Sequence, residues 1–288
     1  MSTSPILSVL TTMYNHEEFI AECIESVQSS MFNDYEHILV DDCSCDETLA
    51  VAHQYAANDS RIKIYQNKEN LGDYPNRNKA ATYAKGKYLK YVDGDDMISP
   101  WLLTLQVDSM EMNPNAALGL FVYGQKQSHK VVQLHVGEAI SDYYANETDI
   151  LNRSPLGAII RRNKFNEVGG FPNKKYVGDF ELWIKLNSVF PIIALPTLQA
   201  HYRVHPHQES AKLRDDYTIH FNYYRAAIDG LKYAKDLGIN YENVEQAIQK
   251  KNSRTILSAV RKCRFKKALN LKSHTENTWA ELFHYATK

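Results

Sequence analysis

The sequence predicts an α/β protein in which helices flank a mostly parallel central sheet and a helical appendage follows at the C-terminus. Short β-branched runs alternate with amphipathic segments of helical period over the first hundred residues. From about Asp215 the helical pattern continues to the last residue without a further strand. Alternation of strands and helices is typical of a parallel sheet wrapped by helices, and the uniform C-terminal pattern indicates a separate helical region.

The first half of the chain supplies the predicted parallel strands, at residues 6–12, 37–40, 61–65 and 88–92. Between them we expect a helix with an apolar face from Phe19 to Val27, one capped by Asp46, and one from Asn76 to Ala84. Each strand ends at a group of polar residues. Because ligands bind beyond the carboxyl ends of parallel strands, we expect the functional site at this edge.

The second half is less regular. Ser99 and Pro100 are typical of a helix start, so we expect a helix over residues 101–111. Tyr143 and Tyr144 fall in a polar stretch that we interpret as a loop. Further strands are predicted at 121–124, 131–136, 192–195 and 199–204, a turn at 169–172 and a helix at 179–187. We divide the chain into a domain at 1–212, with halves 1–98 and 99–212, and a helical region at 213–288.

Composition and charge limit the classes of function. The 288 residues carry a formal net charge of −1, which argues against general nucleic-acid binding. We find no signal peptide and no membrane span, so we expect a cytoplasmic protein. Residues 212–288 hold 15 Lys and Arg against 8 Asp and Glu. The basic amphipathic stretch 256–271 could bind the inner face of an anionic membrane, although packing on the main domain or on another subunit explains it equally well.

Three acids surround one glycine directly after the fourth strand, in the order Asp93-Gly94-Asp95-Asp96. Carboxylates so close together repel one another, and a fold that gathers them usually provides a cation. A solvated turn would account for these acids alone. It would not account for the polar residues that follow the other strands, so we expect a divalent ion here.

Polar residues after the first three strands form one wall at the same edge. The wall consists of Thr11, Thr12, Tyr14, Asn15, Asp42, Ser44, Asn70, Gly72, Arg77 and Asn78. Asp42 can accept a hydrogen bond from a nucleobase, and the Arg77 guanidinium can pair with a phosphate. The chain has neither Gly-x-Gly-x-x-Gly nor a P-loop, which disfavours dinucleotide binding and P-loop chemistry.

These motifs, in this order, resemble glycosyltransferase family 2. The resemblance covers about residues 6–210 and rests on Thr-Thr-x-Tyr-Asn, Val-Asp-Asp-x-Ser-x-Asp-x-Thr, Asn-x-Gly, Arg-Asn and Asp-x-Asp-Asp, then Gly-Gly-Phe, Gly-Asp-x-Glu-Leu-Trp and Tyr-Arg-Val-His. It implies the Rossmann-like GT-A fold. It also implies inverting transfer of a sugar from a nucleotide diphosphate sugar, with Mn²⁺ or Mg²⁺ as the cofactor.

The resemblance implies roles for the residues of the donor side. Thr11, Tyr14, Asp42 and Arg77 would hold the nucleoside, and Asp93 and Asp95 would position the ribose and the metal. The remaining residues of the nucleotide-sugar site would be Thr12, Asn15, Ser44, Asn70, Gly72, Asn78 and Gly94. Asp95 or Asp96 would be the direct metal ligand, a choice that the sequence leaves open.

On the acceptor side, Asp179 falls where the family places its catalytic base, with Glu181 as the competitor. His205 falls where many members supply a histidine to the metal or diphosphate, although His201 and His207 are close enough to replace it. Position 178 is Gly, where many members have an acid beside the base.

We therefore expect a metal-dependent inverting glycosyltransferase of the hexosyl or N-acetylhexosaminyl class, with a UDP-sugar as the first choice of donor. Its acceptor would be a glycan or a lipid-linked sugar in surface polysaccharide synthesis, and oligomers are compatible with the sequence. Tyr143, Tyr144 and Tyr176 are candidates for stacking on the acceptor. The alternative is a non-catalytic nucleotide-sugar or glycan binding module, which would not need Asp179. A nucleotidyltransferase would require a glycine-rich basic loop near the N-terminus, which the chain lacks.

Overall fold

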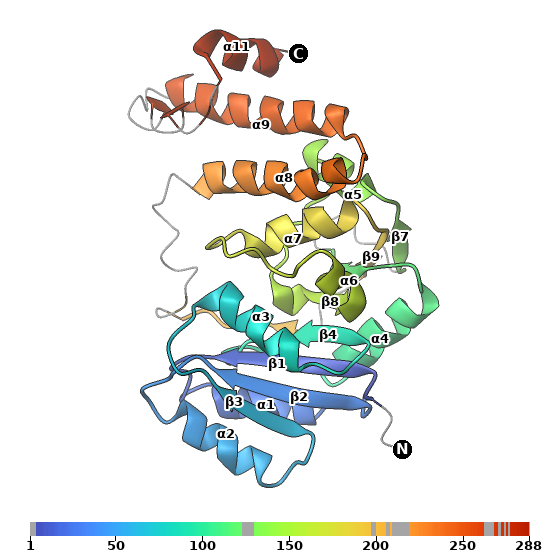
Figure 1. Ribbon diagram of the computed structural model, residues 1–288, viewed down its shortest axis with the longest axis vertical. Coiled ribbons are helices and arrows are strands. Elements are labelled where there is room, and N and C mark those ends of the chain that lie inside the picture. Colours follow the sequence, from blue (N-terminus) through green and yellow to red (C-terminus); the bar gives the residue numbers. More distant parts are fainter. Residues whose placement is uncertain are drawn as a thin grey trace.

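An eight-stranded sheet in the order β3-β2-β1-β4-β8-β6-β9-β7 forms the centre of the molecule (Figure 1). The computed structural model describes residues 4–122, 130–196, 200–205, 208, 219–261, 268–269, 272–273, 275 and 277–287. The strands are β1 (Leu7–Met13), β2 (Tyr35–Asp41), β3 (Ile62–Gln66), β4 (Tyr88–Tyr91), β6 (Leu118–Phe121), β7 (Val132–Leu134), β8 (Ala158–Arg161) and β9 (Ile192–Leu195). A second, two-stranded sheet pairs β5 (Met97–Ile98) with β10 (Ala200–His201).

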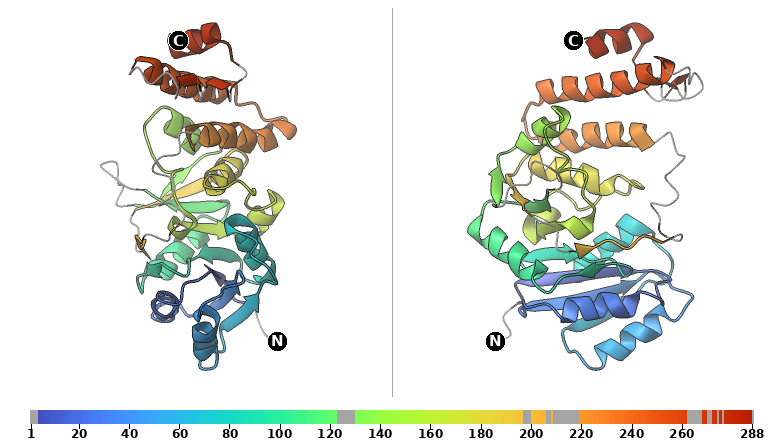
Figure 2. Two further views of the ribbon diagram at one scale, coloured as in Figure 1. Left: turned by 90° about the vertical axis from the view of Figure 1, so that its left-hand side faces the viewer. Right: turned by 180° about the vertical axis from the view of Figure 1, so that it is seen from behind.

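The helices cover both faces of the large sheet, as Figure 2 shows from two further sides. They are α1 (Ile20–Gln28), α2 (Thr48–Ala56), α3 (Asp73–Tyr83), α4 (Leu102–Met112), α5 (Glu138–Tyr144), α6 (Arg162–Glu167), α7 (Gly178–Asn187), α8 (Ile219–Asp236), α9 (Glu242–Arg261) and α11 (Trp279–Thr287), with the short 3-10 helix η1 (Pro155–Gly157). Side chains of consecutive strand residues point to opposite faces of the sheet. Val9 belongs to the core that includes residues of α1, α2 and α4, whereas Leu10 belongs to the core that includes residues of α3 and α7. The sheet therefore forms the middle of three layers, with helices on each side and one hydrophobic core between the sheet and the helices on each face.

The sheet has a parallel half and a mixed half. Strands β3, β2, β1 and β4 are parallel to their neighbours, as the sequence predicts. Strand β8 runs antiparallel to both β4 and β6, and β7 runs antiparallel to β9, while β6 and β9 are parallel. The predicted α/β class with helices on the sheet is confirmed. Strand β8 therefore separates the four parallel strands from the mixed part of the sheet.

Several predicted elements differ from the structure in detail. Tyr143 and Tyr144 end helix α5, so the prediction of a loop is wrong there; Ala139 and Ile140 anchor this helix in the core despite its polar composition. Helix α3 begins at Asp73, earlier than predicted. The predicted strand at 121–124 begins earlier, as β6, and residues 123–124 lie outside the described residues. The predicted strand at 199–204 reduces to the two residues of β10.

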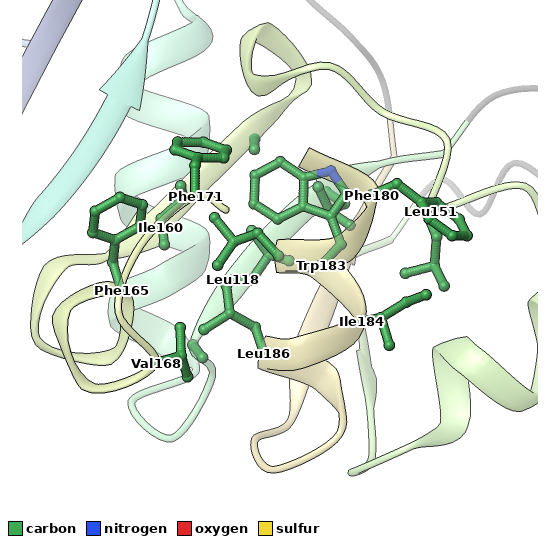
Figure 3. Close-up of a cluster of buried hydrophobic side chains, with 14 of the residues drawn as sticks. Leu118, Leu151, Ile160, Phe165, Val168, Phe171, Phe180, Trp183, Ile184 and Leu186 are labelled. Atoms are coloured by element: carbon green, nitrogen blue, oxygen red, sulfur yellow. The ribbon is translucent and has the colours of Figure 1, made fainter. Parts of the chain in front are cut away.

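The core around Trp183 fixes helix α7 on the sheet (Figure 3). The Trp183 indole is fully buried, and its Nε1 donates a 2.7 Å hydrogen bond to the carbonyl of Arg153. Phe171 packs edge-on against it with ring centroids 6.0 Å apart. A buried indole with a satisfied N–H is rigid, so the N-terminus of α7, which carries Asp179, is held in place.

The C-terminal helices stack above the sheet at the top of Figure 1. Helix α8 packs on α7, and its Ala226, Ala227 and Leu231 belong to the same core as Trp183. The predicted boundary near residue 212 falls outside the described residues. No helix in the described part of the chain is both long and apolar enough to cross a bilayer.

The predicted membrane-binding stretch is only partly described. Ile256 is buried and packs with Leu282 of α11, with Val260 against them; Leu257 is also buried, whereas Leu269 is exposed. Residues 262–267, 270 and 271 lie outside the described residues. The buried apolar side chains of α9 therefore stabilise the protein itself, and a membrane contact of this stretch stays a prediction.

Candidate active site

The acidic turn follows β4 and is held against the end of β1. The backbone N–H of Gly94 donates to the carbonyl of Thr12 at 3.0 Å, and that of Asp96 donates to the carbonyl of Asp93 at 2.9 Å. A Cβ at position 94 would lie 2.6 Å from His16 Nδ1, so only glycine fits. The turn thus places the carboxylates of Asp93, Asp95 and Asp96 at the carboxyl edge of the parallel strands.

Asp93 is paired with Arg77 of α3. The guanidinium donates two hydrogen bonds to the carboxylate, at 2.7 and 2.9 Å, and Thr12 Oγ1 donates a third at 3.1 Å. Burial acts to raise the pKa of Asp93, but Arg77 and Thr12 outweigh it and hold the pKa below its usual range. Arg77 Nε also donates to Asp73 at 2.6 Å. The sequence predicts that the Arg77 guanidinium pairs with a phosphate. In the structure this guanidinium already binds two carboxylates, those of Asp73 and Asp93.

Asp95 and Asp96 have different surroundings. The Nε2 of His205 lies 3.0 Å from Oδ2 of Asp95, and both side chains are partly exposed. Asp96 is buried and accepts the backbone N–H of Arg203 at 2.9 Å. Burial, followed by the charges of Asp93 and Asp95, raises the pKa of Asp96. Asp95 therefore faces the site with His205, whereas Asp96 lies behind it.

A distant segment of the chain brings His205 to the acids. Strand β10 pairs antiparallel with β5, which directly follows the acidic turn. Arg203 then donates from Nε to the carbonyl of Asp95 at 3.0 Å and from a terminal nitrogen to Glu22 at 2.5 Å. Phe19 packs against the His205 ring at 4.8 Å. Of the two histidines that could replace His205, His201 is exposed on β10 and His207 lies outside the described residues.

Asp42 holds the loop that precedes α3. Its carboxylate accepts the backbone N–H groups of Leu71 and Gly72, both at 2.9 Å, and the Asn67 amide at 2.8 Å. Asn70 donates to the Asp42 carbonyl at 3.3 Å. Gly72 has φ of +84°, a conformation that favours glycine. Asp42, which we expect to contact a nucleobase, thus also fixes the loop at residues 67–72 through these hydrogen bonds.

Other residues of the wall tie its loops together. Asn15 receives at its side-chain oxygen the N–H of Cys45 at 2.9 Å and donates its own N–H to Ser44 Oγ at 3.0 Å. Asn78 makes two hydrogen bonds with the backbone of Phe171, at 2.8 and 2.9 Å. These side chains are engaged within the protein.

Thr11 and Tyr14 have opposite surroundings. The Thr11 hydroxyl lies 2.9 Å from His37 Nε2, and the whole residue is buried, with its backbone paired to Leu39 of β2. Tyr14 keeps 44% of its surface exposed. Of the wall residues expected to contact a nucleoside, Tyr14 therefore has a side chain open to solvent.

Asp179 is the second residue of helix α7, close enough to Arg77 and Asp73 of α3 for their charges to act on its pKa. One carboxylate oxygen accepts the N–H of Phe180 at 2.7 Å. Burial is the main cause that raises the pKa of Asp179 to about 6; the charge of Asp73 adds to it, while the Phe180 N–H, Arg77 and Tyr74 oppose it. A carboxylate with such a pKa can accept a proton near neutral pH.

Glu181, the competing candidate, is committed elsewhere. Its carboxylate is buried and pairs with Lys174 at 2.6 Å, and Lys174 also contacts Asp229 of α8 at 2.5 Å. This pairing links α7 to α8. Glu181 therefore takes part in an ion-pair network that joins α7 to α8. Asp179 remains the candidate for the catalytic base.

The residues present fit a divalent ion in part. Among the described residues, no three His, Cys, Asp or Glu side chains converge to form a complete metal site. Asp95 and His205 supply one carboxylate oxygen and one imidazole nitrogen side by side. Divalent ions in nucleotide sites commonly take one or two protein ligands and complete their coordination with phosphate and water. Two ligands are therefore sufficient for an ion that arrives with a nucleotide.

Sequence reasoning missed four residues that shape the site: Asp73, Tyr74, Lys90 and Arg203. Lys90 is fully buried behind the acidic turn and donates to the carbonyls of Leu156 and Ala158. Burial lowers its pKa to about 7. A lysine within an apolar strand is a sequence signal that could have identified Lys90. No sequence signal identifies Tyr74, whose role follows only from its contact with the start of α7.

A family model described as glycosyl transferase family 2 matches residues 8–169. The putative glycosyltransferase EpsE of Bacillus subtilis is 43% identical over 112 residues, which cover 38% of this chain and 40% of EpsE. The putative teichuronic acid biosynthesis glycosyltransferase TuaG of the same organism is 29% identical over 204 residues, covering 69% and 79%. The match to EpsE thus spans about two fifths of that protein's length.

Solved structures share the fold. S. aureus TarS 1-349 in complex with UDP-GlcNAc is 21% identical, with a TM-score of 0.65 over 85% of this chain and 69% of that one. The mannosyltransferase PcManGT from Pyrobaculum calidifontis, in complex with GDP-Man and Mn²⁺, is 15% identical, with a TM-score of 0.62 over 99% and 80%. At these identities the similarity establishes the GT-A fold.

Tyr74 explains the glycine beside Asp179. A Cβ at position 178 would lie 2.7 Å from the Tyr74 ring and 2.8 Å from the carbonyl of Pro172. We expect Gly178→Ala to lower the free energy of unfolding by about 1–3 kcal/mol, because a buried ring or backbone must shift. Urea denaturation measures this loss.

Gly157→Ala is the matched control, since a Cβ there meets only Arg153 at 3.5 Å. Its stability should stay near that of the unmodified protein. Adding Tyr74→Leu to Gly178→Ala should recover part of the loss. Strictly additive losses in the double variant would contradict the contact.

Proposed function

Because this chain belongs to glycosyltransferase family 2, we propose that it transfers a sugar from a nucleotide diphosphate sugar to a glycan or lipid-linked acceptor. The observation that carries the proposal is the convergence of two groups at one sheet edge. Asp95 and His205 lie side by side in the acidic turn region, which Arg77 binds through Asp93, and the charge of Arg77 also acts on Asp179, a carboxylate with a raised pKa. The first pair suits a diphosphate, and Asp179 suits an acceptor hydroxyl.

The donor would bind along the polar wall. Tyr14 directly follows β1 and Asp42 directly follows β2, where a nucleoside would meet them. TarS and PcManGT are complexes with UDP-GlcNAc and GDP-Man, so a UDP-sugar is the first donor to test and a GDP-sugar the second. The similarity to TuaG, which is named for teichuronic acid biosynthesis, supports an acceptor in the synthesis of a surface polysaccharide.

The reaction would be a single displacement at the anomeric carbon. Asp179 accepts the proton of the acceptor hydroxyl as the oxygen of that hydroxyl forms the new glycosidic bond. The bond between the anomeric carbon and the diphosphate oxygen breaks, and the nucleoside diphosphate leaves with that electron pair. Attack from the face opposite the diphosphate inverts the configuration.

Asp95 and His205 would hold Mn²⁺ or Mg²⁺, which stabilises the negative charge of the leaving diphosphate when it is bound. Asp96 would act as a positioning residue, because its carboxylate already accepts the N–H of Arg203 from behind the site. Arg77 would keep Asp93 ionised and oriented through its two hydrogen bonds.

A non-catalytic module that binds nucleotide sugars is the second candidate. The same fold, wall and acidic turn would serve it equally well. It would not need a carboxylate of raised pKa at position 179, so the first experiment addresses that residue.

Asp179→Asn should lower kcat by about 10²–10⁴-fold, because the amide cannot accept the proton. Binding of the nucleotide sugar, measured by thermal shift, should stay close to that of the unmodified enzyme. Glu181→Gln is the control and should retain kcat within about tenfold, since Glu181 contacts Lys174 rather than the site. Substantial turnover by Asp179→Asn would exclude this residue as the base.

The pH dependence of kcat/KM should report the ionisation of Asp179 in the free protein. With a pKa of about 6, the base is protonated in acid, so kcat/KM should fall below pH 6 and level off above pH 7. Tyr74→Phe removes a hydroxyl whose influence lowers the pKa of Asp179, which should move the acid limb to higher pH. Tyr65→Phe, in a ring that stacks on Tyr83 instead, should leave the profile unchanged. An identical profile in all three proteins would rule out this assignment.

Asp95→Ala should abolish the part of the thermal stabilisation by UDP-sugars that depends on Mn²⁺, because the ion loses its carboxylate. Asp96→Asn should keep most of it, since an amide oxygen can still accept the Arg203 N–H. The reverse order of effects would make Asp96 the direct ligand. Unchanged titrations in both variants would remove the metal site from this turn.

A further inference from the structure

A cavity of about 320 Å³ opens where the C-terminal helices meet the acceptor half. Aromatic rings form most of its wall: Tyr143 and Tyr144 from α5, Phe180 from α7, and Tyr223 and Tyr224 from α8. Phe180 packs between two of them, with ring centroids 5.4 Å from Tyr143 and 4.9 Å from Tyr223. Cavities with several aromatic faces and a few polar groups are typical of sites for small ligands.

The cavity lies next to the proposed base. Phe180 directly follows Asp179 in the first turn of α7. The charge of Asp179 also contributes, after burial, to raising the pKa of Tyr223 to about 12. Asp179 itself does not line the cavity, so an acceptor bound there would have to extend past Phe180 to reach the carboxylate.

Helix α9 adds a cation to the aromatic wall. The Lys251 ammonium lies 4.3 Å from the ring centre of Tyr143 and 5.3 Å from that of Tyr144. Lys251 keeps much of its surface exposed, yet partial desolvation at the cavity wall lowers its pKa, and no carboxylate in the described part of the chain contributes to that shift. The site thus offers a positive charge that an anionic ligand could neutralise.

Asn252 adds a buried donor without a partner. Its side chain lines the cavity and is only 8% exposed. Within the described residues, its Nδ2 has no hydrogen-bond partner. Burial of an unpaired donor is costly unless a ligand or water satisfies it, so this amide indicates a polar group in the cavity.

We propose that this cavity binds the acceptor, and that the acceptor is a saccharide carrying a carboxylate or a phosphate. The aromatic rings would pack on the apolar faces of the sugar, Lys251 would neutralise the anion, and Asn252 would donate to a sugar oxygen. The inference rests on the proposed glycosyltransferase function and assigns α8 and α9 a part in acceptor selection.

The test measures saccharide binding without donor, by saturation-transfer NMR titration of the full chain. The probes are methyl β-D-glucopyranoside, methyl β-D-glucopyranosiduronate and glucose 6-phosphate. We expect at least one anionic probe to bind about tenfold more tightly than the neutral one. The tighter of the two identifies the anion as carboxylate or phosphate. Equal affinities for all three, or no binding by either anionic probe, would overturn the proposal.

Lys251→Met should remove that preference, and Lys251→Arg should restore most of it. Lys250→Met is the matched control, because Lys250 is adjacent to Lys251 in the sequence but does not line the cavity. This variant should change the affinity for the anionic probe less than about twofold. Equal losses in the two Met variants would also overturn the proposal.

Thermal shift with UDP-GlcNAc and Mn²⁺ separates this inference from the proposed function. Stabilisation by the nucleotide sugar without selective saccharide binding would reject the acceptor site alone. Selective saccharide binding without stabilisation by any nucleotide sugar would instead support a glycan-binding module and reject the transferase.

Discussion

The carboxylates of Asp93, Asp95 and Asp96 share one short turn because each has a different electrostatic partner. Arg77 pairs with Asp93, His205 lies against Asp95, and the backbone N–H of Arg203 meets Asp96. Without these contacts, mutual repulsion and burial would oppose the turn. The partners come from α3 and from the segment after β10, so both must be in place before the turn is stable. The arrangement of the site depends on this compensation.

The same contacts connect the two sides of the site. Arg77 donates to Asp93 through its terminal nitrogens and to Asp73 through Nε. Tyr74, which follows Asp73 in α3, lies next to Asp179. One turn of α3 therefore joins the acidic turn to the start of α7. Because the ring of Tyr74 lies against Gly178, the spacing between the two sides is set by rigid packing rather than by a loop.

Local patterns in the sequence were sufficient for the parallel half of the sheet. Short apolar runs followed by polar residues mark β1, β2 and β4 directly, and the acids after β2 and β4 follow from the same pattern. The mixed half could not be predicted in the same way, because β8 joins β4 and β6 through antiparallel pairs that local periodicity does not encode. Helix α5 was missed since its apolar residues are few, although Ala139 and Ile140 bury it firmly.

The sequence predicted which residues gather at the site better than what each one contacts. His205 does lie against Asp95, a proximity that spacing along the chain could not provide without the family resemblance. Arg77, Asn78 and Asn15 are also at the predicted edge, yet their side chains hold carboxylates, backbone and neighbouring loops. Residue type indicates what a side chain is able to bind, whereas its partner is set by tertiary packing.

The contact between Asp95 and His205 joins positions 110 residues apart, and the intervening chain includes α4 to α7 and the whole mixed half of the sheet. An ion shared by these two side chains would act as a removable cross-link across that large loop. The pairing of β5 with β10 and the hydrogen bonds of Arg203 already close this loop, so the ion would strengthen an existing closure. Arrival of an ion with a nucleotide would then make the contact between Asp95 and His205 harder to open, and its departure would weaken that contact again.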